Sequence, residues 1–300
     1  MMDRANVLSR EAAEEAIAPT KGASRRSTVR RLLRRPMAVI GILILTVLTL
    51  GSIFAPVVTP YDYRGMNPRA ALQPPSAQHI FGTDHFGRDQ LTRLLYGGRV
   101  SLQVGFIAMS IGVFFGVLLG SIAGYVGGWI DELISRVIDV MLAFPGILLA
   151  LAIIAILGPS LTNLMIAIGI SSIPSFTRLT RGVFLAAREL DYVVAARALG
   201  ASGFGIVFRH MMPNIVAPIM VFGTLAVAGA ILSSAALNFL GLGASPPTPD
   251  WGLMLSESRD YMRRAWWLAT MPGLTIVVTV IAINLVGDAL RDVLDPWMRT

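Results

Sequence analysis

The sequence predicts an all-α integral membrane protein with six transmembrane helices. Of its 300 residues, 54% are hydrophobic and only 14% are charged, whereas a soluble domain carries about 25% charged residues. The apolar residues form long continuous runs, which indicates helices, because the strands of a membrane barrel alternate apolar and polar residues. A spanning helix needs about 20 apolar residues. The candidate spans are residues 37–58, 100–125, 137–157, 161–177, 213–240 and 270–287.

The basic residues predict how these spans are oriented. Lys21 is the single lysine, and a run of arginines lies just before the first span. Positive residues near a span stay on the cytoplasmic side. Six spans place 17 Lys and Arg residues inside and 8 outside, while five spans would put either residues 189–214 or the C terminus outside and fit less well. We therefore expect both termini in the cytoplasm, and the basic excess needs no nucleic acid to explain it.

The first apolar run is too long for the core of a cleaved signal peptide and lacks a small-residue cleavage site. We expect residues 1–36 to be a cytoplasmic tail and residues 37–58 to be the first span. An outside loop follows at residues 59–99, and a five-helix core at residues 100–289. Residues 290–300 would be a second cytoplasmic tail.

The outside loop ends in FGTDHFGRDQLTRLLYGGRVSL. Thr83 or Asp84 can cap a helix start, and Asp89 stands four residues before Arg93 in the order that favours a helical ion pair. We expect a short interfacial helix leading into the second span. A contact with an extracellular partner is the alternative.

The segment GGWIDELISRVID between the second and third spans predicts a tight inside turn. Asp139 would lie about one turn into the third span, where a carboxylate costs about 2.5–3.5 kcal/mol. It can reach water or pair with Arg136. A proton or ion site is the alternative.

The later spans carry small residues and prolines, which suit close helix packing. Three asparagines within or near them could line a transport path or form hydrogen bonds between helices: Asn163, Asn238 and Asn284. In the outside loop before the last span, residues 254–262 look amphipathic. Trp266 and Trp267 fit an interfacial aromatic belt.

Sequence motifs for catalysis are absent. A nucleotide-binding GxxxxGK[ST] loop cannot form because the context of Lys21 is wrong. Cysteine is absent, and the three histidines are scattered, so we expect neither a metal site nor a catalytic residue. Ion-coupled carriers usually show carboxylates at membrane depth and an internal repeat. Their scarcity favours a transporter driven by a partner over an ion-coupled secondary carrier that works alone.

The polar block ELDYVVAARALGASGFGIVFRHMMPN, residues 189–214, interrupts the apolar spans. Its alanines predict a helix over residues 190–199, Gly200 can adopt the left-handed conformation that ends it, and Ser202 can cap a restart that runs to Pro213. Alanines leave a smooth face that another protein can approach. A helix lying on the bilayer surface fits the spacing equally well.

This block resembles the EAA loop of bacterial ABC importer permeases, in which two alanines are followed by a glycine and then by an I-x-L-P end. Ala195, Ala196, Gly200 and Pro213 match that spacing. Val194 replaces the motif's Glu, and His210 begins a triplet that replaces I-x-L. The segments FGTDHFGRD, LAFPGILL, NFLGLGASPPTPDWG and GDALRDVLDP are similar to the C-type permease subunit of the dipeptide, oligopeptide, nickel and glutathione importers.

The resemblance implies a type I ABC importer permease fold in a bacterial inner membrane, with residues 59–99 in the periplasm. Partners would be a homologous B-type permease, two cytoplasmic ATPase subunits that bind ATP and Mg, and an extracytoplasmic substrate-binding protein. The chain itself would hold no cofactor. The stretch SIPSFTRLTRG leans toward glutathione-like peptide permeases, and the substrate stays open. The implied ATPase-coupling residues are Asp191, Tyr192, Ala195, Ala196, Arg197 and Gly200.

Overall fold

The computed structural model describes residues 30–294, apart from the side chain of Asn214, and it has no β-strand within them. Most of the expected N-terminal tail and the last six residues of the expected C-terminal tail lie outside the described residues. The helices in chain order are α3 (Pro36–Ile53), α4 (Ala55–Val58), η1 (Pro68–Ala70), α5 (Gln90–Val126), α6 (Gly128–Leu142), α7 (Gly146–Leu157), α8 (Leu161–Ala187), α9 (Asp191–Ala198), α10 (Gly203–Gly205), the π-helical turn η2 (Ile206–Met211), α11 (Met212–Phe239), α12 (Trp251–Glu257), η3 (Arg259–Tyr261) and α13 (Trp267–Leu294).

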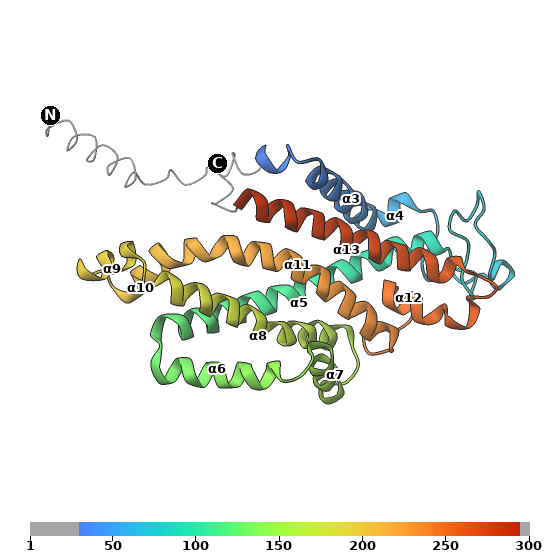
Figure 1. Cartoon of the computed structure of the whole chain (residues 1–300). Helices are drawn as coiled ribbons and strands as arrows, with labels where there is room; N and C mark the ends of the chain where they lie inside the picture. The colour runs from blue at the N-terminus through green and yellow to red at the C-terminus, as the bar shows by residue number, and fades with distance from the viewer. Residues whose placement is uncertain (1–29, 295–300) are drawn as a thin grey trace.

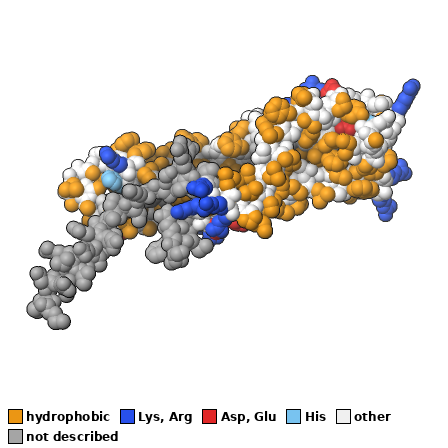
Figure 2. All heavy atoms as spheres, turned by 90° about the horizontal axis from the view of Figure 1, so that it is seen from above, with side chains coloured by type: hydrophobic (Ala, Val, Ile, Leu, Met, Phe, Trp, Pro, Cys, Tyr) orange, Lys and Arg blue, Asp and Glu red, His pale blue; other side chains and the backbone are white. Residues whose placement is uncertain are grey.

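The long helices form an elongated bundle (Figure 1). Helices α5, α8, α11 and α13 run along its length, and α3 lies beside α13. Helices α9 and α10 extend beyond one end, the α9 end, while α12 and the loop before α5 lie at the other, the α12 end (Figure 1). Hydrophobic side chains cover most of the face seen in Figure 2, as expected of a surface that contacts lipid.

Four of the described helices are long and apolar enough to cross a membrane: α3, α5, α11 and α13. Helices α6 and α7 together make a fifth candidate, although they meet at 91°. Helix α8 is as long as these but carries more polar residues, and it is not among them. The all-helical membrane fold is therefore confirmed, and the count of six spans stays a prediction.

The candidate span over residues 137–157 is interrupted in the structure. Helix α6 ends at Leu142 and α7 starts at Gly146, with Pro145 as the N-cap of α7 at ψ 133°. Proline has no backbone N–H to continue the α6 ladder and disfavours a helical residue before it. The expected turn GGWIDELISRVID is also mostly helix, since only Gly127, at φ 70°, separates α5 from α6, and Gly128, at φ 58°, is the first residue of α6.

Helix α5 begins ten residues earlier than the predicted second span. Its 37 residues measure about 55 Å, against about 30 Å for the hydrocarbon core, so one end of it projects out of the membrane. The expected interfacial helix is thus the first part of a continuous one. Its N-cap is Asp89, whose carboxylate accepts the backbone N–H of Thr92 at 2.8 Å, and the predicted caps Thr83 and Asp84 are wrong.

A row of glycines on α5 lets α8 approach backbone to backbone. It comprises Gly112, Gly116, Gly120 and Gly124, every fourth residue, and we call it the glycine seam. A Cβ at Gly120 would lie 2.5 Å from the carbonyl oxygen of Thr177. Small residues at this spacing allow membrane helices to pack by close van der Waals contact.

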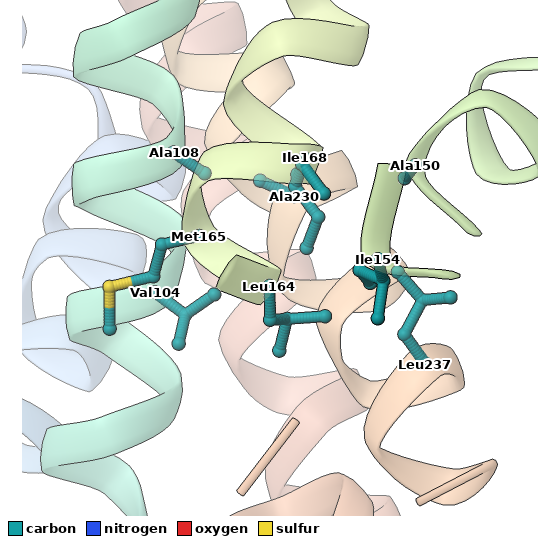
Figure 3. Packing of buried hydrophobic residues seen from close by; sticks show 10 residues of the cluster. Val104, Ala108, Ala150, Ile154, Leu164, Met165, Ile168, Ala230 and Leu237 are labelled. Carbon is teal, nitrogen blue, oxygen red and sulfur yellow. The ribbon is translucent and has the colours of Figure 1, made fainter. Parts of the chain in front are cut away.

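The apolar core beside this seam joins four helices (Figure 3). Val104 and Ala108 of α5 face α8, while α7 and α11 close the other sides. The buried residues from α7, α8 and α11 are Ala150, Ile154, Leu164, Met165, Ala167, Ile168, Ala230 and Leu237. The bend at Pro145 thus brings the short α7 into the core.

Candidate functional site

The chain reverses at the α9 end through a short helix and a turn. Helix α9 ends before Gly200, which has φ 79°, and Ser202 accepts the backbone N–H of Gly205 at 3.2 Å. The π-helical turn η2 then leads into α11. The predicted helix, its glycine stop and the Ser202 cap are confirmed. Asp191 in its first turn and Arg197 in its last turn complement the helix dipole.

Helix α9 is held on the bundle mainly through one side chain. Val193 is fully buried and packs in a cluster with Phe184, Ala187, Ile206, Met211 and Ile215. Ala196 is half-buried at the edge of this cluster. The helix therefore rests on the bundle along a narrow stripe.

The other faces of α9 are open. Of the six residues implied by the resemblance, all except Ala196 are exposed. The ring of Tyr192 lies 6.5 Å from that of His210. We define the α9 surface as the exposed residues Asp191, Tyr192, Val194, Ala195, Arg197, Leu199 and Gly200.

The α9 surface is more apolar than the alanine pattern suggested. Leu199 is 87% exposed, and Phe204 and Phe208 in the segment that follows it are 74% and 54% exposed. Large apolar side chains that gather on an open surface mark a contact with lipid or with another protein. The sequence pattern did not predict the exposure of these residues. The signal was an apolar residue directly before a helix-ending glycine, where an exposed helix would carry a polar one.

Two of the three candidate path-lining asparagines bond within turns. Asn163 donates to the carbonyl oxygens of Leu157 and Gly158 at 2.9 and 3.0 Å. The amide oxygen of Asn238, which is fully buried, accepts the backbone N–H of Ala244 at 2.6 Å. Asn284 is half-buried on α13. Their role in lining a path stays a prediction.

At the α12 end, four charged side chains form a buried network. Asp84 accepts from Arg88 and from Arg93 at 2.6 Å each. Arg93 also donates to Glu257 at 2.7 Å. The predicted Asp89–Arg93 pair is wrong, because Asp89 caps α5 and bonds to His79 at 2.9 Å. The network joins the loop before α5 to α12.

Two tryptophan side chains form hydrogen bonds with backbone carbonyl groups at the same end. Trp267 donates its indole N–H to the carbonyl oxygen of Thr83 at 3.1 Å, and Trp251 donates to that of Leu94 at 2.9 Å. Trp267 is only 4% exposed, so its predicted place in an interfacial belt is wrong. Trp266 is 54% exposed and fits that belt.

Burial shifts the pKa of two groups at the α12 end. It lowers the pKa of His85, against the carboxylates of Asp84 and Glu257, which favour protonation. It raises the pKa of Asp250, although Ser101 and two backbone N–H groups donate to that carboxyl group. Both shifts follow from removing the charged form from water.

Two ion pairs join α6 to α8. Asp139 lies 2.8 Å from Arg178, and Asp131 lies 2.5 Å from Arg181. The predicted Asp139–Arg136 pair is wrong, because Arg136 lies 3.7 Å from Glu132 instead. The missed signal was spacing: the two aspartates stand eight residues apart and the two arginines three apart, so each pair lies on one helix face.

Comparisons with known proteins agree with this geometry. The family described as "Binding-protein-dependent transport system inner membrane component" matches residues 116–300. The family described as "N-terminal TM domain of oligopeptide transport permease C" matches residues 25–75.

Curated relatives match nearly the whole chain. A dipeptide transport system permease protein of Alkalihalophilus pseudofirmus is 51% identical over 92% of this chain and 90% of its own length. A glutathione transport system permease protein of Shigella flexneri serotype 5b is 48% identical over 90% of this chain and 89% of its own.

A solved structure titled as inward facing conformations of the MetNI methionine ABC transporter matches this chain with TM-score 0.55 and 19% identity. It covers 67% of this chain and 95% of the matched one, and it supports the type I fold. The resemblance seen in the motifs is confirmed, and the permease function holds over the ion-coupled carrier.

Proposed function

This chain belongs to the family of inner membrane components of binding-protein-dependent transport systems, and we propose that it imports peptides when ATPase subunits bind its α9 surface. It is a multi-pass permease subunit of an ABC importer and not an enzyme. ATP and Mg would be bound by the ATPases, and their closure would move α9 and bias the bundle between two states.

The observation that carries the proposal is the contrast within α9. One fully buried residue, Val193, holds the helix on the bundle, while Leu199 is left 87% exposed. An α-helix that presents a small-residue face with apolar neighbours fits a groove on another protein. Helices α10, η2 and α11 follow one another without a gap, so a displacement of α9 reaches a membrane helix through one short turn.

The remaining partners follow from the family. The α9 end and both termini would lie in the cytoplasm, and the α12 end would receive an extracytoplasmic substrate-binding protein. A homologous B-type permease would complete the translocation path. Dipeptide and glutathione permeases are both among the relatives, and both substrates are small peptides with free ionised termini.

The experiment is uptake of a labelled dipeptide by the complete transporter that carries Ala195→Glu in this chain. We expect uptake and peptide-stimulated ATP hydrolysis to fall at least tenfold, because a buried unpaired charge in a protein interface costs about 2–5 kcal/mol. Insertion into the membrane should be unchanged. The matched control is Ala186→Glu, the same change at an exposed alanine of α8 outside the α9 surface.

Wild-type uptake by Ala195→Glu would overturn the proposed coupling. A helix that only lies on the bilayer would instead give a variant with weaker membrane attachment of this segment and normal ATPase binding. Co-purification of the ATPase subunits with each variant separates the two results.

A further inference from the structure

The two ion pairs between α6 and α8 border an open polar cleft. Its volume is about 260 Å³ and its lining is Ser135, Ile138, Asp139, Thr177, Arg178 and Arg181. The side chains of Asp139 and Arg178 are 60% and 63% exposed, while those of Asp131 and Arg181 are 17% and 35% exposed. The rest of the described chain therefore leaves this face uncovered.

The packing of α8 on the glycine seam sets the depth of these charges. A Cβ at Gly120 would lie 3.0 Å from the backbone N of Arg181, so this arginine lies level with the middle of the seam. On the same turns of α5, Leu118 and Ile122 are 45% and 38% exposed. The arginines thus lie at a level where the neighbouring helix presents large apolar side chains outward.

Exposed charges at this level need water or a polar group to solvate them. Ionised side chains within a membrane face the bundle interior or a water-filled cavity because hydrocarbon does not solvate them. Asp139 and Arg178 satisfy each other only in part, since more than half of each side chain remains open. Water, a polar solute or a polar surface of another subunit must cover the rest.

We infer that the α6–α8 cleft lines the translocation path and binds the two charged ends of a peptide. The inference rests on the proposed import of peptides. Asp139 would accept the N-terminal ammonium, and Arg178 would donate to the C-terminal carboxylate, for which the guanidinium fork is shaped. Both peptide termini are largely ionised at neutral pH. Without solute, the two side chains pair with each other and leave no isolated charge in the path.

The first test measures whether the cleft is wet. The chain has no cysteine, so Ser135→Cys supplies a single thiol in the cleft. Val140→Cys is the matched control, because Val140 lies on the opposite side of α6 from Asp131 and is 64% exposed. In the assembled transporter, a membrane-impermeant maleimide should label Ser135→Cys and spare Val140→Cys, and saturating dipeptide should slow the labelling at least threefold. Absence of labelling at Ser135→Cys, with and without ATP, would overturn the inference.

The second test separates a solute site from a helix-to-helix brace. Arg178→Gln and Asp139→Asn should each lower the maximal dipeptide uptake about tenfold, since a bond to a charged group is lost. The double variant should stay as low as the single ones. A brace alone would give the opposite result, because removing both charges leaves no unpaired group and uptake would recover.

The control for this test is Glu132→Gln with Arg136→Gln, which removes an exposed pair within α6 and should leave uptake unchanged. If the wild-type transporter does not take up dipeptide, the proposed function fails. If it does, and the double variant of Asp139 and Arg178 takes it up at the wild-type rate, only this inference fails.

Discussion

The two ends of the molecule differ in which side chains they bury and which they expose. At the α12 end, Asp84, Arg88 and Arg93 are each at most 2% exposed and are paired within the chain. At the α9 end, one valine holds a helix whose apolar neighbours stay open. Buried charges that pair within one chain need no other molecule to neutralise them, whereas a group of exposed apolar side chains marks a surface that contacts another molecule. The α12 end is thus completed by its own side chains, and the α9 end is completed by a partner.

The largest expected effect is at the α12 end. Asp84→Ala removes the carboxylate that accepts from Arg88 and Arg93. The two guanidinium groups would stay buried without it, and breaking one side of a buried pair costs about 3–5 kcal/mol. Thermal unfolding of the purified protein in detergent measures this loss. Asp260→Asn, at an exposed site of the same end, should be neutral, and equal stability of the two variants would contradict the comparison.

A smaller and local effect is expected at the α9 end. Val193→Ala removes two buried methyl groups, at about 0.8 kcal/mol each. Because α9 rests on the bundle mainly at this side chain, hydrogen exchange should accelerate within α9 and stay unchanged within α12. Leu199→Ala, at an 87% exposed position, is the control and should leave exchange as it is. Faster exchange in both helices would show that the two ends are not held separately.

The smallest effect is the pH dependence of the α12 end. Burial lowers the pKa of His85 below 6.5, so the unfolded chain takes up the proton first as pH falls. The contribution of neutral His85 to the free energy of unfolding is complete above its unfolded pKa of about 6.5. This contribution is lost as pH falls through the lowered pKa of the folded state. Arg88 and Arg93 oppose protonation there, while Asp84 and Glu257 favour it.

The unfolding temperature should therefore drop as pH falls below about 7.5, and His85→Gln should make this drop smaller. If the unfolding temperature of the variant followed the same pH profile as that of the wild type, His85 would not cause the loss of stability in acid.

Much of the candidate site could be predicted because its signals are local. The helix over residues 190–199, the stop at Gly200 and the restart at Ser202 depend on residues a few positions apart, and the structure has all three. The exposed Leu199 was missed because burial depends on which helices surround a residue. No pattern within α9 shows that Val193, with Ala196 beside it, faces the bundle.

Wrong ion-pair predictions have a common cause. The predicted partner of Arg93 was Asp89 and that of Asp139 was Arg136, in each case a near neighbour in sequence. The structure pairs Arg93 with Glu257, 164 residues away, and Asp139 with Arg178, 39 residues away. Both of those partners come from other helices.

Apolar run length, helix caps and glycine conformation act within a few residues, so the residues alone predict a helical membrane protein with a polar helical block between its spans. The 91° bend between α6 and α7, the burial of Trp267 and the open charged cleft appear only in the folded chain. These features depend on which helices become neighbours. That choice is made by packing such as the glycine seam, which brings residues far apart in sequence to the same depth.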